Sequence, residues 1–330
     1  MSVLLRAAAA IFLAAAFAGR ALAAESCEPQ KVADVELLTL PDGSVFMPAS
    51  VNGHDVYFAL TIGAGLPLIL ESALEPLGIK AKPRIGGGEM TIAGQRITRY
   101  AMLEKLMVGD YRFLDRAAPL IPLVDTGWPT ELNGKPVIGR MGSTLIQRVD
   151  AEIHLAEHRL RLFKNFRCRD RSPVYWEGPV AEMPMRFDEA QTLVFTLELE
   201  GKRIESSLLN GSLVSTVDAN VTREFFGFDE TSPGIGAGVF HAMSLTGRDL
   251  TLADVPVRLL TGSPCKVTGS VAVHRAIGYV SCVNAVPFNI GTDLLTRMRV
   301  YIASEKGRVY VSIVGQAQPG EAASISITPR

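Results

Sequence analysis

The strongest constraint on the fold of this 330-residue chain is an internal repeat with a period of about 148 residues. Residues 46–64 read as an apolar strand, a turn and a second apolar strand, ending in Thr61-Ile62-Gly63-Ala64. Residues 194–212 repeat this plan and end in Leu209-Asn210-Gly211-Ser212. Three pairs align at an offset of 148 without a gap: Gly53 with Gly201, Leu60 with Leu208, and Gly63 with Gly211.

A second landmark also occurs twice. Residues 142–148 open on Gly142 and lead into a hairpin at 151–163, and residues 291–297 open on Gly291 and lead into a hairpin at 300–312. The turn glycine precedes this second glycine by 79 residues in the first copy (63 to 142) and by 80 in the second (211 to 291). The matched spacing predicts duplication of one folding unit.

Short apolar runs rich in Val, Ile, Leu, Tyr and Phe alternate with Gly, Pro, Asn and Asp, which predicts a mostly β protein. Each half also carries a glycine cluster between its two landmarks. Glycine permits positive φ, as the tip of a mobile flap requires, and an ordinary surface loop fits the pattern equally well. The clusters are Gly86, Gly87 and Gly88 in the first half and Gly234, Gly236 and Gly238 in the second.

This order of strand, turn, glycine-rich hairpin and short helix resembles the retropepsin-like and pepsin-like aspartic peptidases, in particular exported bacterial proteins with two retropepsin-like halves. The resemblance covers about residues 44–163 and 190–313. It implies a mainly β, bilobal aspartic-peptidase fold in which two β-barrel halves are related by a pseudo-twofold axis. The expected organisation is a signal peptide (1–23), an N-terminal half (24–165), a junction (166–189), a C-terminal half (190–314) and a flexible tail (315–330).

The catalysis of that family needs two carboxylates about 3 Å apart that share one proton, and each turn donates one Asp. Here Thr61 and Leu209 hold the two Asp positions, and neither side chain can serve as the acid or the base. The resemblance therefore implies degenerate active-site positions with no catalytic residue. The expected cleft floor consists of Thr61, Ile62, Gly63, Ala64, Leu209, Asn210, Gly211 and Ser212, and the glycine clusters are the expected flaps.

An Asp-Thr-Gly tripeptide does occur at residues 125–127. It lies 15 residues before Gly142 (127 to 142), which leaves no room for a flap, so a turn after an edge strand is the favoured interpretation. The alternative is an active aspartyl protease that uses non-standard carboxylates such as Asp125 or Asp55. No GxSxG, HExxH or Walker sequence supports another hydrolase class.

Three other polar residues have ordinary structural interpretations. His154 and His158 fall on the first closing hairpin, where surface positions are the default. Asp218 stands at the start of a short helix and is expected to be its N-cap rather than a base.

The N-terminus predicts export. Residues 3–18 form a run rich in Ala, Leu and Phe, and Ala21-Leu22-Ala23 fits a signal-peptidase site, so a periplasmic or secreted location is expected. The apolar run is shorter than the roughly 20 residues of a bilayer span, so we expect no stable membrane span after cleavage. All four cysteines follow the signal, which favours disulfides: Cys265 with Cys282 across a short loop, and Cys27 and Cys168 bracketing the first half.

Charge and motifs narrow the function. Lys and Arg number 33 against 34 Asp and Glu, without a long basic run, which disfavours nucleic acid as a partner. No compact zinc spacing occurs, and neither a metal nor a cofactor is expected. The sequence therefore predicts an exported, non-catalytic protein that binds an extended peptide or protein segment in an interlobe cleft.

Overall fold

The computed structural model describes residues 27–63, 67–83, 91–92, 95–113, 118–123, 128–189, 191–208, 211–227, 239–247, 250–261, 279–280 and 286–314. Several predicted features lie outside these residues. They are the signal peptide (1–23), Ala64, the six flap glycines, Asp125, Leu209, Asn210, Cys265, Cys282 and the tail (315–330).

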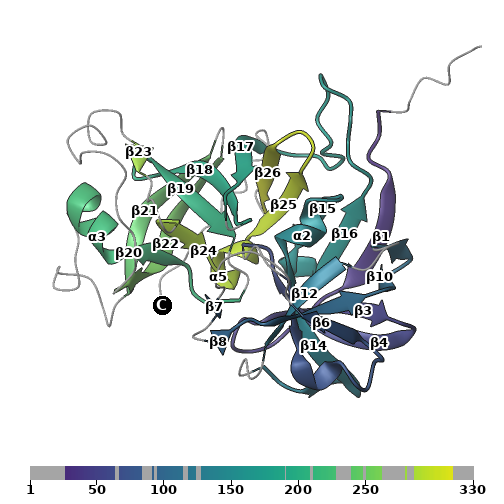
Figure 1. Ribbon diagram of the computed structural model, residues 1–330. Helices are drawn as coiled ribbons and strands as arrows, with labels where there is room; N and C mark the ends of the chain where they lie inside the picture. The colour runs from purple at the N-terminus through teal and green to yellow at the C-terminus, as the bar shows by residue number, and fades with distance from the viewer. Residues whose placement is uncertain are drawn as a thin grey trace, which may run out of the picture.

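The protein is mainly β, with 52% of the structure in strands and 10% in helices. The described strands form a 13-stranded sheet, an 11-stranded sheet and a two-stranded one, and the large sheets mix parallel and antiparallel pairs. The prediction of two closed β-barrel halves is wrong, because no closed barrel forms among the described strands. The 13-stranded sheet instead contains strands of both halves, so neither half closes on itself (Figure 1).

The first half is built around strand β14, which lies between β4 and β5. β14 runs parallel to β4 and antiparallel to β5, and β12 runs parallel to β5. The β3–β4 hairpin begins this unit, as the sequence predicted. The bounds are β3 (Val45–Val51), β4 (His54–Thr61), β5 (Leu68–Leu70), β12 (Ala118–Leu123) and β14 (Lys135–Gly142).

The second half repeats these pairings. β24 runs parallel to β19 and antiparallel to β20, and β22 runs parallel to β20. The registers match: Met141 pairs with Leu60 in the first half, and Ile290 pairs with Leu208 in the second, at offsets of 149 and 148. The predicted repeat is thus present in the strand pairing. The bounds are β18 (Leu193–Leu199), β19 (Lys202–Leu208), β20 (Thr216–Asp218), β22 (Leu250–Leu260) and β24 (Phe288–Ile290).

Six neighbouring strands of the 13-stranded sheet, here called the central sheet, join the two halves through the antiparallel pair β15–β25 (Figure 1). Glu152 pairs with Tyr301, 149 residues away, while the flanking pairs Ala151–Ile302 and Ile153–Val300 interchange under the same shift. A local pseudo-twofold axis therefore passes between Glu152 and Tyr301. In order, the strands are β1 (Lys31–Glu36), β16 (Arg159–Phe163), β15 (Asp150–His154), β25 (Met298–Ala303), β26 (Arg308–Ile313) and β17 (Ala181–Phe187).

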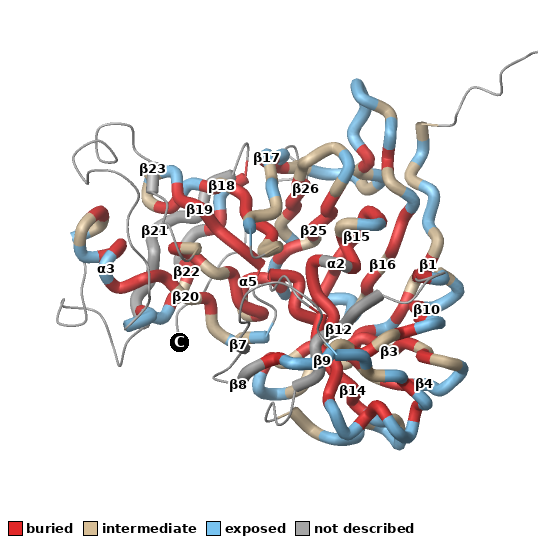
Figure 2. The backbone as a smooth tube through the Cα atoms, in the orientation of Figure 1, coloured by how far each residue is buried: buried red, intermediate tan, exposed pale blue. Residues whose placement is uncertain are grey.

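The middle strands of the central sheet, β15, β25 and β26, are largely buried on both faces, whereas the outer strands β1 and β17 also carry exposed residues (Figure 2). Because side chains alternate along a strand, Ala151, Ile153, Val300 and Ile302 point to one face, where they join the main apolar core. On the opposite face, Phe163, Tyr301, Ala303 and Tyr310 form a separate cluster covered by Val174, Trp176 and Val180 of the junction. We call these the inner and outer faces.

The remaining elements are short strands and turns of helix. The predicted helices after Gly142 and Gly291 are present as α2 (Ser143–Ile146) and α5 (Thr292–Leu295). The others are β2 (Leu38–Thr39), η1 (Glu71–Ala73), β6 (Lys80–Pro83), β7 (Thr91–Ile92), β8 (Gln95–Arg96), β9 (Arg99–Leu103), β10 (Leu106–Val108), β11 (Tyr111–Arg112), β13 (Glu131–Leu132), η2 (Leu155–Glu157), α3 (Ala219–Val221), η3 (Thr222–Phe226), β21 (Val239–Gly247) and β23 (Tyr279–Val280).

Candidate functional site

The two aligned turns touch each other. A Cβ atom added at Gly63 would lie 1.9 Å from the carbonyl oxygen of Leu208, so the first turn packs directly on the backbone of the second copy. In return, a Cβ atom at Gly211 would lie 3.6 Å from Cγ2 of Thr61. Strands β4 and β19 end at this place, and each delivers its turn to the other half. We call it the turn contact.

The side chains at the turn contact carry hydroxyls rather than carboxylates. Thr61 and Ser207 are buried, and their Oγ atoms have no hydrogen-bond partner among the described residues. A Cβ atom at Gly63 would lie 2.9 Å from Oγ of Ser207, so this hydroxyl belongs to the contact. An unpaired polar group in the protein interior destabilises the fold, so these two hydroxyls should lower the stability of the turn contact. None of Thr61, Gly63, Ser207, Leu208 and Gly211 can supply a shared proton near neutral pH.

The second turn is braced by a polar network that the sequence did not reveal. Asp293, in the first turn of α5, accepts hydrogen bonds from the backbone N–H of Ser215 (3.0 Å) and from its hydroxyl (2.7 Å). The Thr292 N–H donates to the Ser212 carbonyl at 2.9 Å. A Cβ atom at Gly43 would lie 2.5 Å from Cα of Leu213, so a loop of the first half also packs on this turn. The Asp293 carboxylate therefore stabilises the backbone that follows the second turn.

Of the predicted cleft floor, Thr61, Ile62, Gly63, Gly211 and Ser212 are described. Thr61 and Ile62 are buried, and Gly63 and Gly211 lie at the turn contact. Ala64, Leu209 and Asn210, together with the flap residues Gly86, Gly87, Gly88, Gly234, Gly236 and Gly238, lie outside the described residues.

Of the two alternative catalytic carboxylates, Asp55 and Asp125, only Asp55 is among the described residues. Asp55 pairs with Lys135 at 2.8 Å in an exposed position. It lies six residues before Thr61 on β4, roughly 20 Å away along a strand that rises about 3.3 Å per residue. Asp125 lies outside the described residues.

Asp218 is a helix cap, as predicted. Its Oδ1 accepts hydrogen bonds from the backbone N–H groups of Asn220 (2.9 Å) and Val221 (3.1 Å) at the start of α3. This arrangement satisfies N–H groups that the first helical turn leaves unpaired.

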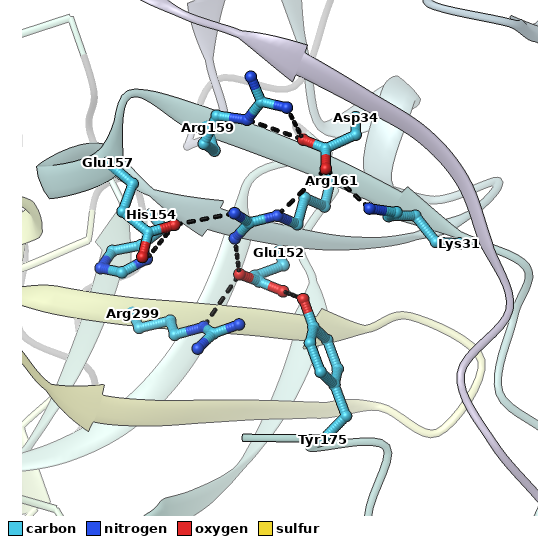
Figure 3. Close-up of polar contacts among 9 residues, drawn as sticks. All are labelled: Lys31, Asp34, Glu152, His154, Glu157, Arg159, Arg161, Tyr175 and Arg299. Atoms are coloured by element: carbon cyan, nitrogen blue, oxygen red, sulfur yellow. Dashed lines mark hydrogen bonds and ion pairs between the residues drawn. The ribbon is translucent and has the colours of Figure 1, made fainter. Parts of the chain in front are cut away.

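A charged cluster on the outer face of the central sheet was missed by the sequence reasoning (Figure 3). Glu152, fully buried, accepts hydrogen bonds from Arg161 Nη1 (2.6 Å), from Arg299 Nε (2.9 Å) and from the Tyr175 hydroxyl. Arg299 also stacks on Trp176, with its guanidinium carbon 4.1 Å from the ring centroid. The available signal was the alternation of polar and apolar residues over 150–154, which places three titratable side chains on one face.

His154 corrects a prediction, because it is buried rather than at the surface. The reason is its place on the outer face, which the junction covers. Its Nδ1 lies 3.1 Å from Glu157 Oε2, yet neither ring nitrogen is hydrogen-bonded to another described residue. Burial lowers the pKa of His154, and the nearby Arg299 adds to the effect while Glu157 opposes it. His158, by contrast, is exposed, as predicted.

Two other carboxyls of the outer face have opposite pKa shifts. Burial raises the pKa of Asp150 to about 6, although the backbone N–H groups of Phe166 (2.9 Å) and Ser304 (3.0 Å) donate to it. Partial burial also opposes ionisation of Asp34, but hydrogen bonds from Lys31 and Arg159 outweigh it and lower the pKa.

The cysteines and the search for metal sites complete the inventory. Cys27 and Cys168 form a disulfide with their Cα atoms 5.8 Å apart, while Cys265 and Cys282 lie outside the described residues. No group of three or more His, Cys, Asp or Glu side chains in the described ranges is placed to hold a metal ion. No helix there has the length and apolar character to cross a lipid bilayer.

Proposed function

No protein-family model matches this chain, and no curated protein matches it either. We propose that it is an exported, non-catalytic relative of the two-domain aspartic peptidases, and that it binds an extended peptide or protein segment over the turn contact. The observation that carries this proposal is the reciprocal packing of Gly63 on Leu208 and of Gly211 on Thr61. Thr61 belongs to this contact and Leu209 follows Leu208 in the sequence, and these are the positions at which such enzymes hold their carboxylates.

The chemistry of the turn contact favours binding over hydrolysis. A shared-proton pair needs two carboxyl groups in contact, and Thr61 and Leu209 supply none. Within the described residues the hydroxyls of Thr61 and Ser207 have no hydrogen-bond partner, and each can donate or accept a hydrogen bond. Because both side chains are buried, a peptide reaches them only when the turns separate. An extended peptide offers N–H and C=O groups at regular spacing, which suits such a floor better than ionic recognition does.

Binding can be tested with a fluorescent library of extended apolar heptapeptides, measured by anisotropy. Thr61→Val and Ser207→Ala remove the two hydroxyls with little change in volume, and each should weaken the tightest peptide by about three- to tenfold, the worth of one hydrogen bond. Thr130→Val and Ser72→Ala, at exposed positions, are matched controls and should leave binding unchanged. If all four variants bind alike, the turn contact is not the peptide site.

The same preparation tests hydrolysis. The wild type should leave the peptides intact from acidic to neutral pH. Turnover abolished by Asp125→Asn would overturn the proposal in favour of a protease with non-standard carboxylates.

Export is part of the proposal, and the Cys27–Cys168 disulfide supports it because such bonds persist in oxidising compartments. N-terminal sequencing of the mature protein should read from Ala24. A mature chain that begins at Met1 would contradict it.

A further inference from the structure

The junction borders an open pocket of about 710 Å³. One wall is the loop 166–172, and the other comes from the β25–β26 turn and strands β17 and β26. This volume is in the range of small-molecule sites. The lining residues are Phe166, Arg167, Arg169, Asp170, Arg171, Ser172, Glu182, Glu305, Lys306, Arg308 and Tyr310.

The pocket is locally basic in a chain whose net charge is −1. Five basic side chains line it against three acidic ones. Two of the basic groups are already paired, because Arg308 lies 3.0 Å from Glu182 and Arg167 lies 3.5 Å from Glu305. Lys306, Arg169 and Arg171 therefore face only Asp170, which leaves a surplus of positive charge.

Two of these cations are free to bind. Arg169 and Arg171 are exposed, and in the part of the chain that the structure describes neither guanidinium has a hydrogen-bond or ion-pair partner. A guanidinium presents a planar fork of donors that matches a carboxylate or a phosphate with two parallel hydrogen bonds. Two such forks, two residues apart, suit a ligand with more than one oxyanion group.

The loop that carries these arginines is held in place. Lys306 Nζ donates to the backbone carbonyls of Cys168 (2.9 Å) and Arg169 (3.3 Å), and also to that of Arg171. The Cys27–Cys168 disulfide fixes the same loop, and the Phe166 N–H donates to Asp150. A loop ordered before binding spends little conformational entropy on the ligand, which favours a site over a chance cluster of surface charge.

We propose that this pocket binds a small molecule that carries two or more carboxylate or phosphate groups. Arg169 and Arg171 hold the anionic groups, while Phe166 and Tyr310 contribute aromatic surface at the base of the pocket. The site is separate from the turn contact and does not depend on the proposed peptide binding.

Isothermal titration of the disulfide-intact protein with citrate and with pyrophosphate tests the proposal and tells carboxylate from phosphate. We expect one saturable site for at least one probe. The Arg169→Gln/Arg171→Gln variant should weaken it by at least tenfold, because each bidentate contact is charge-assisted. Asp170→Asn should tighten it by about two- to fivefold, because it removes a like charge.

Arg258→Gln/Arg297→Gln is the matched control, since it removes the same charge from two exposed arginines elsewhere. It should leave the dissociation constant within about twofold. Absence of saturable binding by both probes at about 10 mM would overturn the proposal. Equal weakening in the two double variants would overturn it too, because only non-specific charge attraction would then remain. Unchanged melting temperatures would show that the variants fold.

Discussion

The two halves meet at the turn contact and at the strand pair β15–β25, and the two copies of the repeat compare differently at these places. At the turn contact both copies keep glycine, at Gly63 and Gly211. At the strand pair the inner face keeps its residue type, with Ile153 matching Ile302 at the same offset of 149. The outer face does not, because Glu152 matches Tyr301.

This difference shows which positions the backbone constrains and which it leaves free. The close approach of Gly63 to a carbonyl oxygen admits no side chain, and the inner face must fill one continuous core. The junction packs on the aromatic part of the outer face, and the stretch that would match it under the offset of 149 begins at residue 315, outside the described residues. The outer face itself is asymmetric, with a charged cluster near β16 and aromatic packing near β26.

The largest expected effect is on the turn contact, where substitutions of the two aligned glycines should differ in their cost to stability. In Gly63→Ala the new Cβ would lie 1.9 Å from a backbone oxygen, so the turns must separate, and we expect the free energy of unfolding to fall by roughly 4 kcal/mol. In Gly211→Ala the nearest atom is 3.6 Å away, and the cost should stay below about 1 kcal/mol. Urea unfolding measures both variants. Equal losses would mean that the two glycines make equivalent contacts.

The next effect concerns the charged cluster. Glu152→Ala leaves the guanidinium groups of Arg161 and Arg299 largely buried without their shared carboxylate, which should cost about 3 kcal/mol in urea unfolding. Asp55→Ala, which breaks the exposed pair with Lys135, is the control and should cost less than about 1 kcal/mol. Similar losses in the two variants would show that the outer face is as open to water as the surface.

Titratable groups on the outer face should make the free energy of unfolding depend on pH. The pKa of Asp150 is raised to about 6 in the folded protein, so the fold holds this proton more tightly than the unfolded chain does. Its contribution to stability is therefore present below about pH 4 and is lost as the pH rises to about 6, by roughly 2–3 kcal/mol. The lowered pKa of His154 acts in the opposite direction, since it favours the folded state above pH 6.5.

Comparing Asp150→Asn with the wild type isolates the Asp150 contribution. The difference between their unfolding free energies should change steadily between pH 4 and pH 6, because only the wild type carries the titrating carboxyl. A lost hydrogen bond in the variant would shift its curve by a constant amount. Parallel curves across this interval would contradict the raised pKa.

The sequence predicted the repeated features and missed the asymmetric ones. The offsets of 148 and 149 predicted two copies of one unit, and the structure gives those copies matched registers, of β4 with β14 and of β19 with β24. The same repeat predicted the short helices α2 and α5. Comparing the copies could not reveal the buried cluster around Glu152, because the equivalent position holds a different residue type.

The failure of the barrel prediction has a similar cause. Each half was treated as a unit that closes on its own strands, whereas β15 and β25 pair with each other across the pseudo-twofold axis. The arginines of the junction were interpreted only as part of a linker. What gives them a role is the distant Lys306, which hydrogen-bonds to their loop and which no local pattern connects to it.

The smallest expected effect tests how the junction is held on the outer face. The Tyr175 hydroxyl donates to Glu152, while its ring lies 5.5 Å from that of Phe163 and 5.2 Å from the Arg299 guanidinium. Burial and the hydrogen bond to Glu152 raise the pKa of Tyr175 to about 12, so the hydroxyl keeps its proton at every physiological pH. Tyr175→Phe removes one hydrogen bond and keeps the ring, and the junction should be destabilised by about 1 kcal/mol.

Hydrogen exchange resolves this loss where a global unfolding curve would not. If residues 174–176 exchange through local opening, Tyr175→Phe should speed their exchange about fivefold, and amides at the turn contact should not change. Tyr310→Phe is the control, because this buried tyrosine packs with Phe163 and Tyr301 on the same face and its hydroxyl makes no side-chain hydrogen bond within the described residues. Exchange that stays the same in Tyr175→Phe would show that the hydrogen bond from Tyr175 to Glu152 does not hold residues 174–176 in place. The charged cluster would then stabilise only the sheet beneath it.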